Sequence, residues 1–245
     1  MLWLEDMTRA LYIAWKDAKA YYLKPPNISW GMIFPVAMSL AFILKSSSDI
    51  GELVPGLIGM ATLFGTTSMA AVTITFERRI GSLERLLLAP ISLHALILGK
   101  VLGSALFGIT ISLVMVFLGT IFLGAPMMSP ALLFLTILVA SLTFSAMGCF
   151  VSVSVREVFE AQTLANLFRF PMIFLSGVFL PISSMPLPAQ VIAYALPLTY
   201  AVEGLRYALF GRCETLIPLV GLPVMLFYGL AFFLGSVHVL EKRQK

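Results

Sequence analysis

The sequence predicts an all-α polytopic membrane protein with six transmembrane helices. Of its 245 residues, 60% are hydrophobic and only 11% are charged, whereas ordinary soluble domains carry about 25% charged residues. The longest gap without Asp, Glu, Lys or Arg runs from 101 to 155. Because about 20 apolar residues cross a bilayer core, this gap is long enough for two helices, which the turn residues at 124–130 would join.

The remaining charge-free stretches set the other spans, within a single domain that covers 1–245. A helix that crosses the bilayer core needs about 20 apolar residues. We therefore expect six spans, in chain order at 28–44, 54–76, 95–123, 131–155, 159–180 and 216–240.

The distribution of Lys and Arg predicts the orientation. With both termini in the cytoplasm, Lys45, Arg206 and Arg212 lie outside, and the other 13 of the 16 Lys and Arg residues lie inside. Cytoplasmic loops carry such an excess of positive charge. This bias requires an even number of crossings. It also accounts for the net charge of +4 without a nucleic-acid partner, so none is expected.

The segment 170–202 decides whether the number of crossings is even, because its apolar run is too long for one span and too short for two. Five prolines interrupt it. We predict that span five is followed by a re-entrant hairpin at 181–200, which enters the outer leaflet and returns. Proline-broken backbone is tolerated at that depth only where protein or a water-filled cavity surrounds it. The hairpin should therefore pack against other helices and not face lipid.

The first residues, 1–24, predict a helix that lies on the membrane surface. Apolar residues recur there at intervals of three and four, which places them on one helical face: Trp3, Leu4, Met7, Leu11, Ala14, Trp15, Ala18 and Tyr22. Charged residues mostly occupy other positions: Glu5, Arg9, Lys16, Asp17 and Lys19. The alternative is a helix that packs on a soluble partner.

The segment 77–92, between spans two and three, predicts a short cytoplasmic helix. Gly81 would break the incoming helix, Ser82 would cap a new one and Pro90 would end it. Leucines share one face of this helix and charged residues lie off it: Leu83, Leu86 and Leu87 against Glu84 and Arg85. Such a helix suits docking into a cleft of a cytoplasmic partner. An ordinary connecting helix is the alternative.

At these residues the chain resembles the permease subunits of type-2 ATP-binding-cassette (ABC) transporters, whose first cytoplasmic loop carries a similar motif. Arg79 replaces an acidic residue of the family's pattern, and Ser82 replaces a threonine. The positions that match are Glu77, Arg78, Gly81, Leu83, Glu84, Leu86, Pro90, Ile91 and Ser92. A second match covers 174–181, Met185, Pro186, 197–200 and Arg206. The resemblance implies that 82–89 is a coupling helix, which transmits motion from an ATPase.

ATP would have to bind to another subunit. The chain contains no phosphate-binding loop, since the pair Gly99 and Lys100 lacks both the earlier glycine and the following hydroxyl residue. By resemblance, this chain binds no cofactor, an ABC ATPase subunit binds ATP and Mg, and two identical or related permeases pair as a homodimer or heterodimer. The alternative is an ion-coupled secondary carrier or channel without an ATPase. Such a carrier usually needs an acidic residue or His inside a span, and none of the 12 acidic residues lies well inside a predicted span.

Two helices carry polar stripes that are candidates for a translocation path. On 159–180 the stripe consists of Gln162, Asn166, Arg169 and Ser176, and on 54–76 it consists of Gly59, Thr62, Thr66 and Thr73. Arg169 lies near mid-membrane, 11 residues before Leu180. By resemblance these helices line the path between the paired subunits, where Arg169 would hold an anionic headgroup. The alternatives are snorkelling or interface hydrogen bonding for Arg169, and helix packing for the threonines.

Residues around the hairpin are candidates for an external gate: Pro181, Pro186, Pro197, Tyr200, Glu203 and Arg206. Solvated or paired surface groups are the alternative for the charged members. We expect no metal site and no catalytic residue, because His94 and His238 are the only histidines and neither belongs to a ligand cluster. Cys149 and Cys213 would lie far apart, so no disulfide is expected.

These observations together predict the permease of an exporter in the cytoplasmic membrane of a prokaryote. Its surroundings would be membrane lipid, a second permease and the ATPase. The phenylalanine-rich spans and the single arginine within them favour a lipophilic or amphipathic substrate, such as a drug or a lipid, over a long polar glycan.

Overall fold

The computed structural model describes residues 2–22, 33–45, 50–214 and 218–244. These residues form helices and turns, and none of them lies in a β-strand, so the all-α prediction is confirmed. In chain order the elements are α1 (Leu2–Tyr21), α3 (Phe34–Lys45), η2 (Ile50–Leu53), α4 (Val54–Arg79), α5 (Ser82–Leu88), α6 (Leu93–Ile121), α7 (Pro130–Ser154), α8 (Val158–Leu175), η3 (Ile182–Ser184), α9 (Leu187–Tyr194), α10 (Pro197–Phe210) and α11 (Pro218–Gln244).

Among the described residues, four helices are long and apolar enough to cross a membrane: Gly51–Arg79, Leu93–Ile121, Pro130–Ser154 and Pro218–Arg243. They correspond to the predicted spans at 54–76, 95–123, 131–155 and 216–240. The other two predicted spans differ. α8 is shorter than expected and carries Glu160, Gln162, Asn166 and Arg169 within its 18 residues, and 28–32 lie outside the described residues. The count of six therefore stays a prediction.

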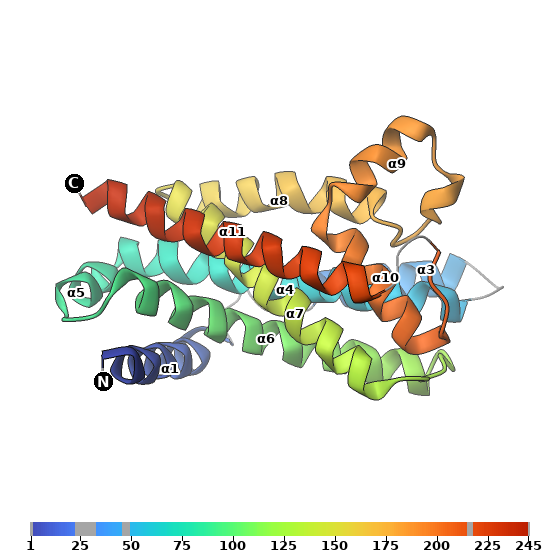
Figure 1. Ribbon diagram of the computed structural model, residues 1–245, viewed down its shortest axis with the longest axis horizontal. Coiled ribbons are helices and arrows are strands. Elements are labelled where there is room, and N and C mark those ends of the chain that lie inside the picture. Colours follow the sequence, from blue (N-terminus) through green and yellow to red (C-terminus); the bar gives the residue numbers. More distant parts are fainter. Residues whose placement is uncertain (1, 23–32, 46–49, 215–217, 245) are drawn as a thin grey trace.

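The helices form an elongated bundle around α4 (Figure 1). α4 contacts α6, α7, α8 and α10, and the apolar part of this helix is buried throughout. The two chain ends lie at the same end of the bundle as α5, and α9 lies at the opposite end (Figure 1). Termini at one end agree with an even number of crossings. Which end faces the cytoplasm stays a prediction.

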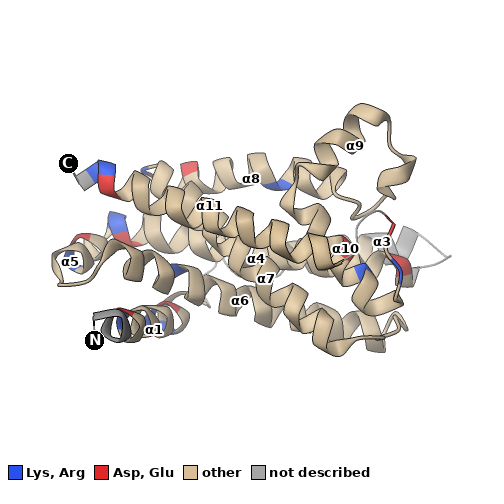
Figure 2. Cartoon of the chain, in the orientation of Figure 1, with Lys and Arg blue, Asp and Glu red and all other residues tan. Residues whose placement is uncertain are grey.

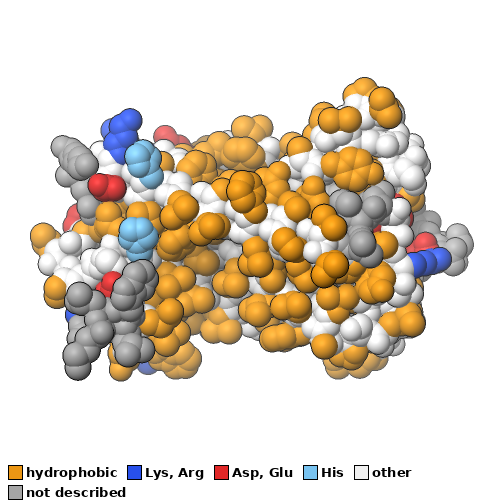
Figure 3. Space-filling view, in the orientation of Figure 1, with side chains coloured by type: hydrophobic (Ala, Val, Ile, Leu, Met, Phe, Trp, Pro, Cys, Tyr) orange, Lys and Arg blue, Asp and Glu red, His pale blue; other side chains and the backbone are white. Residues whose placement is uncertain are grey.

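Charged side chains lie mainly toward the two ends of the bundle (Figure 2). The surface between the ends is largely hydrophobic (Figure 3). Soluble proteins rarely expose contiguous apolar patches of more than a few hundred Å². This belt of exposed apolar residues fits a chain whose sides face lipid.

α1 packs along α6, where a glycine permits the close approach. A Cβ at Gly99 would lie 2.8 Å from the carbonyl oxygen of Ala10. The buried side of α1 holds Ala10, Ile13, Ala14, Asp17 and Tyr21, and its exposed side holds Met7, Leu11, Tyr12 and Trp15. Burial therefore corrects one expectation. Asp17, placed in the polar set, faces the bundle, because the buried Lys100 of α6 supplies a countercharge there.

The predicted hairpin at 181–200 consists of η3, α9 and the first turn of α10. α10 is buried by α4, α7 and α11, and Leu198 and Val202 are fully enclosed. The expected packing against other helices is wrong for one side of α9, where Leu187 is 75% exposed. Local hydrogen bonds satisfy backbone amides of this short helix, such as Ala189 N to the Pro186 carbonyl at 2.9 Å. Its backbone therefore does not depend on a protein neighbour.

Candidate functional site

α5 is a short helix at the end of the bundle that carries both termini (Figure 1). Gly81 occupies the N-cap position at φ 70°, a left-handed conformation that glycine adopts readily. Ser82 is therefore the first residue of α5 and makes no capping hydrogen bond, which corrects the predicted cap. Ala89 is extended before Pro90, as expected for a residue that precedes proline. The predicted end of this helix is confirmed.

The leucine face of α5 holds the helix to the bundle. Leu83 is 2% exposed and belongs to an apolar cluster with residues of α4, α6, α7 and α11, and Leu86 and Leu87 pack half-buried against it. Burial of one leucine is worth about 1.5–3 kcal/mol. The outward face consists of Glu84, Arg85 and Leu88, and Leu88 is 87% exposed. Leu88 and Arg85 were not among the predicted site residues. At about 100° per residue, Leu88 lies about 140° around the helix from Leu83, a signal that the sequence contained.

A basic groove of about 670 Å³ adjoins α5. Arginines predominate among its charged residues: Arg78, Arg79, Arg156 and Arg243, with Glu84 and Glu157. Two of them bind carbonyls at the end of α7. Arg78 donates to the Val155 carbonyl at 2.6 Å, and Arg243 donates to the carbonyls of Val155 and Ser154. Cations near a helix C-terminus are stabilised by the helix dipole. These hydrogen bonds connect α4 and α11 to the end of α7 beside the groove.

Four ionisable side chains form an ion cluster where α1, α4 and α6 meet: Lys16, Asp17, Glu77 and Lys100. The Lys100 ammonium lies 2.8 Å from Asp17 Oδ2, and the Lys16 ammonium lies 3.0 Å from Asp17 Oδ1. Both lysines also donate to Glu77. Asp17, Glu77 and Lys100 are at most 2% exposed, so the cluster joins three helices directly before α5.

The sequence interpretation missed the ion cluster. The sequence places Glu77 in the loop motif and counts Lys100 only among the cytoplasmic cations. One signal was present, because Lys100 lies inside a predicted span and a lysine there is costly unless it is paired. Its partners lie 23 residues away in Glu77 and much further away in Asp17.

Burial and charge shift the titration of the α1 members of the cluster. Burial raises the pKa of Asp17, and Lys100 opposes this shift. Burial alone would lower the pKa of Lys16, but the carboxylates of Asp17 and Glu77 raise it above its usual value. Tyr21, one turn further along α1, has its pKa raised to about 12 by burial and by the charge of Glu77. Lys16 is therefore charged at neutral pH.

Arg169 lies fully buried between α8 and α4. Its Nε donates to Thr67 Oγ1 at 2.6 Å and its Nη1 donates to Asn166 Oδ1 at 3.0 Å. The guanidinium carbon also lies 4.9 Å from the centre of the Phe64 ring, within range of a cation–π interaction. The side chain is thus enclosed by protein and does not extend to solvent.

The other residues of the two stripes lie in helix contacts. Thr62 Oγ1 lies 2.7 Å from Ser112 Oγ of α6, and Thr66 and Thr73 donate to carbonyls of their own helix. On α8, the amide of Gln162 is buried without a hydrogen-bond partner, and Ser176 follows the last residue of the helix. The role of either stripe in transport stays a prediction.

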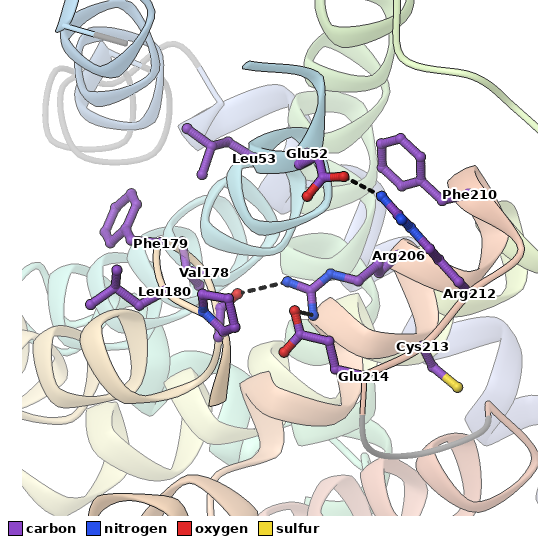
Figure 4. Close-up of a pocket in the computed structure, with 12 residues that line it drawn as sticks. Glu52, Leu53, Val178, Phe179, Leu180, Arg206, Phe210, Arg212, Cys213 and Glu214 are labelled. Atoms are coloured by element: carbon purple, nitrogen blue, oxygen red, sulfur yellow. Dashed lines mark hydrogen bonds and ion pairs between the residues drawn. The ribbon is translucent and has the colours of Figure 1, made fainter. Parts of the chain in front are cut away.

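Two of the gate candidates, Pro181 and Arg206, line a cavity of about 380 Å³ at the opposite end of the bundle (Figure 4). Arg206 forms ion pairs with Glu203 and Glu214 and donates to the Gly177 carbonyl at 3.1 Å. Glu214 also accepts from the Ile182 amide at 3.2 Å. Glu203 is 2% exposed. Glu203 and Arg206 are therefore paired groups that hold the turn at 177–182 against α10.

The prolines of the hairpin have structural positions. Pro181 and Pro186 precede η3 and α9, and Pro197 begins α10. Tyr200 Oη donates to the Tyr194 carbonyl at 2.6 Å, which links α10 to α9. A gating role for these residues stays a prediction. Within the described ranges, no group of three His, Cys, Asp or Glu side chains is arranged for a metal ion.

The fold and its contacts define a multi-pass membrane protein with charged clusters toward its two ends. The family model described as ABC-2 type transporter matches residues 8–210, so the chain belongs to the ABC-2 type transporter family. Its place in this family is that of a membrane transport permease.

Relatives of known name agree with this assignment. The chain is 24% identical to the inner membrane transport permease YadH of Escherichia coli K12, over 98% of this chain and 93% of that protein. It is 27% identical to the probable multidrug ABC transporter permease YbhS of the same organism, over 86% of this chain and 53% of YbhS. It is 29% identical to the putative transport permease ycf38 of Porphyra purpurea, over 62% of this chain and 53% of that protein.

Proposed function

We propose that this chain is the membrane-spanning subunit of an ATP-driven exporter that moves a lipophilic or amphipathic compound out across the cytoplasmic membrane of a prokaryote. Two such permeases, identical or related, would pair with two ABC ATPase subunits. The observation that carries the proposal is the placement of α5. It presents Glu84, Arg85 and Leu88 outward at one end of the bundle, and its leucines anchor it to α4, α6 and α11.

The proposed topology has six spans with both termini in the cytoplasm. Besides the four long helices, the spans would include 28–44 and α8. α1 would lie on the inner membrane surface, with Met7, Leu11, Tyr12 and Trp15 toward lipid, because these side chains are exposed and amphipathic helices bury such faces at the interface. α9 and α10 would form the re-entrant hairpin on the outer side.

In the proposed mechanism, ATP and Mg bind only to the ATPase subunits, whose closure pushes on α5. Because Gly81 joins α5 directly to α4, the push would tilt α4. The ion cluster would carry this motion to α1 and α6, since its side chains bridge all three helices. The permease itself would make and break no covalent bond.

The ion-coupled carrier finds less support. Such a carrier needs an acidic side chain that binds and releases the coupling ion. The buried carboxylates of Asp17 and Glu77 each already contact two lysines. A carboxylate neutralised in this way is a poor ion-binding group.

Leu88→Asp is expected to abolish stimulation of the ATPase and to weaken association with it about 10-fold or more, because it places a charge in the centre of the proposed contact. The measurement is ATP hydrolysis by, and co-purification with, the proposed ABC ATPase partner, which would be sought as a phosphate-loop protein encoded beside this chain. Leu187→Asp on α9 is the matched control, since Leu187 is also exposed but lies at the opposite end. Equal effects of the two variants, or none, would contradict a coupling role for α5.

Cys213 provides a test of the orientation. It is partly exposed beside the cavity of Figure 4, whereas Cys149 is buried, and both are free thiols. In right-side-out vesicles, a membrane-impermeant maleimide should label the wild type, and Cys213→Ser should remove the label. Labelling that appears only after the vesicles are opened would place this end in the cytoplasm and reverse the proposed topology.

A further inference from the structure

Arg169 is a buried cation without a countercharge. It is 0% exposed and is the largest fully buried side chain among the residues that the structure describes. No carboxylate of the described chain lies within ion-pair distance of it, and its Nη2 has no hydrogen-bond partner. Native proteins seldom bury an unpaired charge, so each such group requires an explanation. The simplest explanation is a ligand that supplies the missing negative charge.

A pocket of about 770 Å³ lies on α8, and one of its lining residues, Asn166, is a hydrogen-bond partner of Arg169. Its walls are largely apolar and come from Phe159, Leu164, Leu167, Phe170 and Pro171, with Val155, Glu160 and Thr163. Asn166 also lines it, and Asn166 Oδ1 is the acceptor for Arg169 Nη1. Movement of the Asn166 side chain would therefore open a polar passage from an apolar pocket to the guanidinium.

We infer that this pocket binds an amphiphile with one anionic group, a carboxylate, sulfate or phosphate, which displaces Asn166 and pairs with Arg169. The apolar tail would lie along Leu167 and Phe170, whose side chains are exposed toward the sides of the bundle. Arginine binds such oxyanions through two parallel N–H donors, and Nη2 supplies the unused one. Glu160 opposes an anion only at the far end of α8, nine positions from Arg169 in the sequence.

This inference names the substrate class of the exporter proposed above and rests on that proposal. The same chemistry suits a transported compound and a bound anionic lipid. A competition experiment distinguishes these two sources. An excess of phosphatidylglycerol in the bilayer would displace a transported anion only if the lipid and the anion both bind in this pocket. The binding test needs no ATPase, so its failure is distinct from a failure of α5 coupling.

The experiment measures the binding of a fluorescent C12 carboxylate and of its methyl ester to the purified protein in phosphatidylcholine nanodiscs. The wild type should bind the carboxylate about 10-fold more tightly than the ester, as expected for one charge-assisted pair. Arg169→Gln should bind both equally. Equal binding by the wild type, or a preference that survives Arg169→Gln, would overturn the inference.

Asn166→Asp is the sharper variant, because it keeps Arg169 and places a carboxylate at the position of Oδ1, 3.0 Å from Nη1. The internal countercharge should remove the preference for the carboxylate and raise the melting temperature. Ser183→Asp, which adds the same charge in the exposed η3, should keep the preference. A preference retained in Asn166→Asp would overturn the inference even if Arg169→Gln failed to fold.

In nanodiscs that contain phosphatidylglycerol, weaker binding of the carboxylate probe would identify lipid as a competing occupant of the same anion site. Unchanged binding would restrict the site to the free amphiphile.

Discussion

Lys100→Met is expected to lower the free energy of unfolding by about 3–5 kcal/mol, because it leaves two buried carboxylates facing each other. Lys100 contacts both Asp17 and Glu77, and all three side chains are at most 2% exposed. After the substitution, Lys16 alone would balance two negative charges, and its side chain is 44% exposed. Unfolding by denaturant in detergent measures the loss.

The double variant Lys100→Met with Glu77→Gln should recover much of this stability. It leaves the pair of Lys16 and Asp17, 3.0 Å apart, with no net charge. Replacing a buried ion pair by neutral groups is often close to neutral in free energy, whereas removing one partner is not. The control is Arg212→Met in the pair with Glu52, where both side chains are more than half exposed. Such exposed pairs contribute about 0–1 kcal/mol. If Lys100→Met cost no more than this control, the ion cluster would not hold the three helices together.

Gly56→Ala is expected to cost about 1–3 kcal/mol and to loosen the turn that follows α8, because the added methyl group has no room. A Cβ at Gly56 would lie 2.3 Å from the Val178 carbonyl oxygen and 2.8 Å from the Val178 Cα. These are backbone atoms, so no rotamer change relieves the contact. Arg206 holds the same turn through the Gly177 carbonyl, and the turn would have to move against that bond.

The measurement combines the free energy of unfolding with the rate of maleimide labelling at Cys213, which lines the cavity beside the turn. The rate should rise in Gly56→Ala. Gly65→Ala in the same helix is the matched control, because its Cβ would approach the nearest atom, the Gly108 Cα, only to 3.4 Å. Equal stability and equal labelling of the two variants would show that α4 and the turn are not in contact as described.

The helices that hydropathy predicts best are those whose charges lie outside them. α6 and α7 follow the predicted spans within a few residues, because each is an apolar run bounded by turn residues. Hydropathy predicts α8 less well. Gln162, Asn166 and Arg169 lower its mean hydropathy, and the helix ends at Leu175 where a span to 180 was expected. Gly177, at φ 76°, and Pro181 account for this end, since the chain turns there to meet α10.

The sequence predicted the helix α5, but it did not predict which of its residues point outward. Gly81, Pro90 and the leucine spacing indicated a short amphipathic helix, and that helix is present. Which face docks on the bundle depends on what lies beneath it. The apolar cluster of α4, α6, α7 and α11 takes up Leu83, so Leu88 and Arg85 point outward. Helical periodicity groups residues by face, but it does not say which face meets a neighbour.

The sequence by itself determined that this is an α-helical membrane protein, where four of its long helices lie, and which loops carry its motifs. These properties follow from local sums of transfer free energy and from turn residues, which are independent of distant neighbours. Only the tertiary structure decided that Lys16 meets Glu77 across 61 positions and that Arg169 meets Thr67 across 102. A buried charge is stable only beside its partner, and partners that far apart in the sequence are brought together by packing alone.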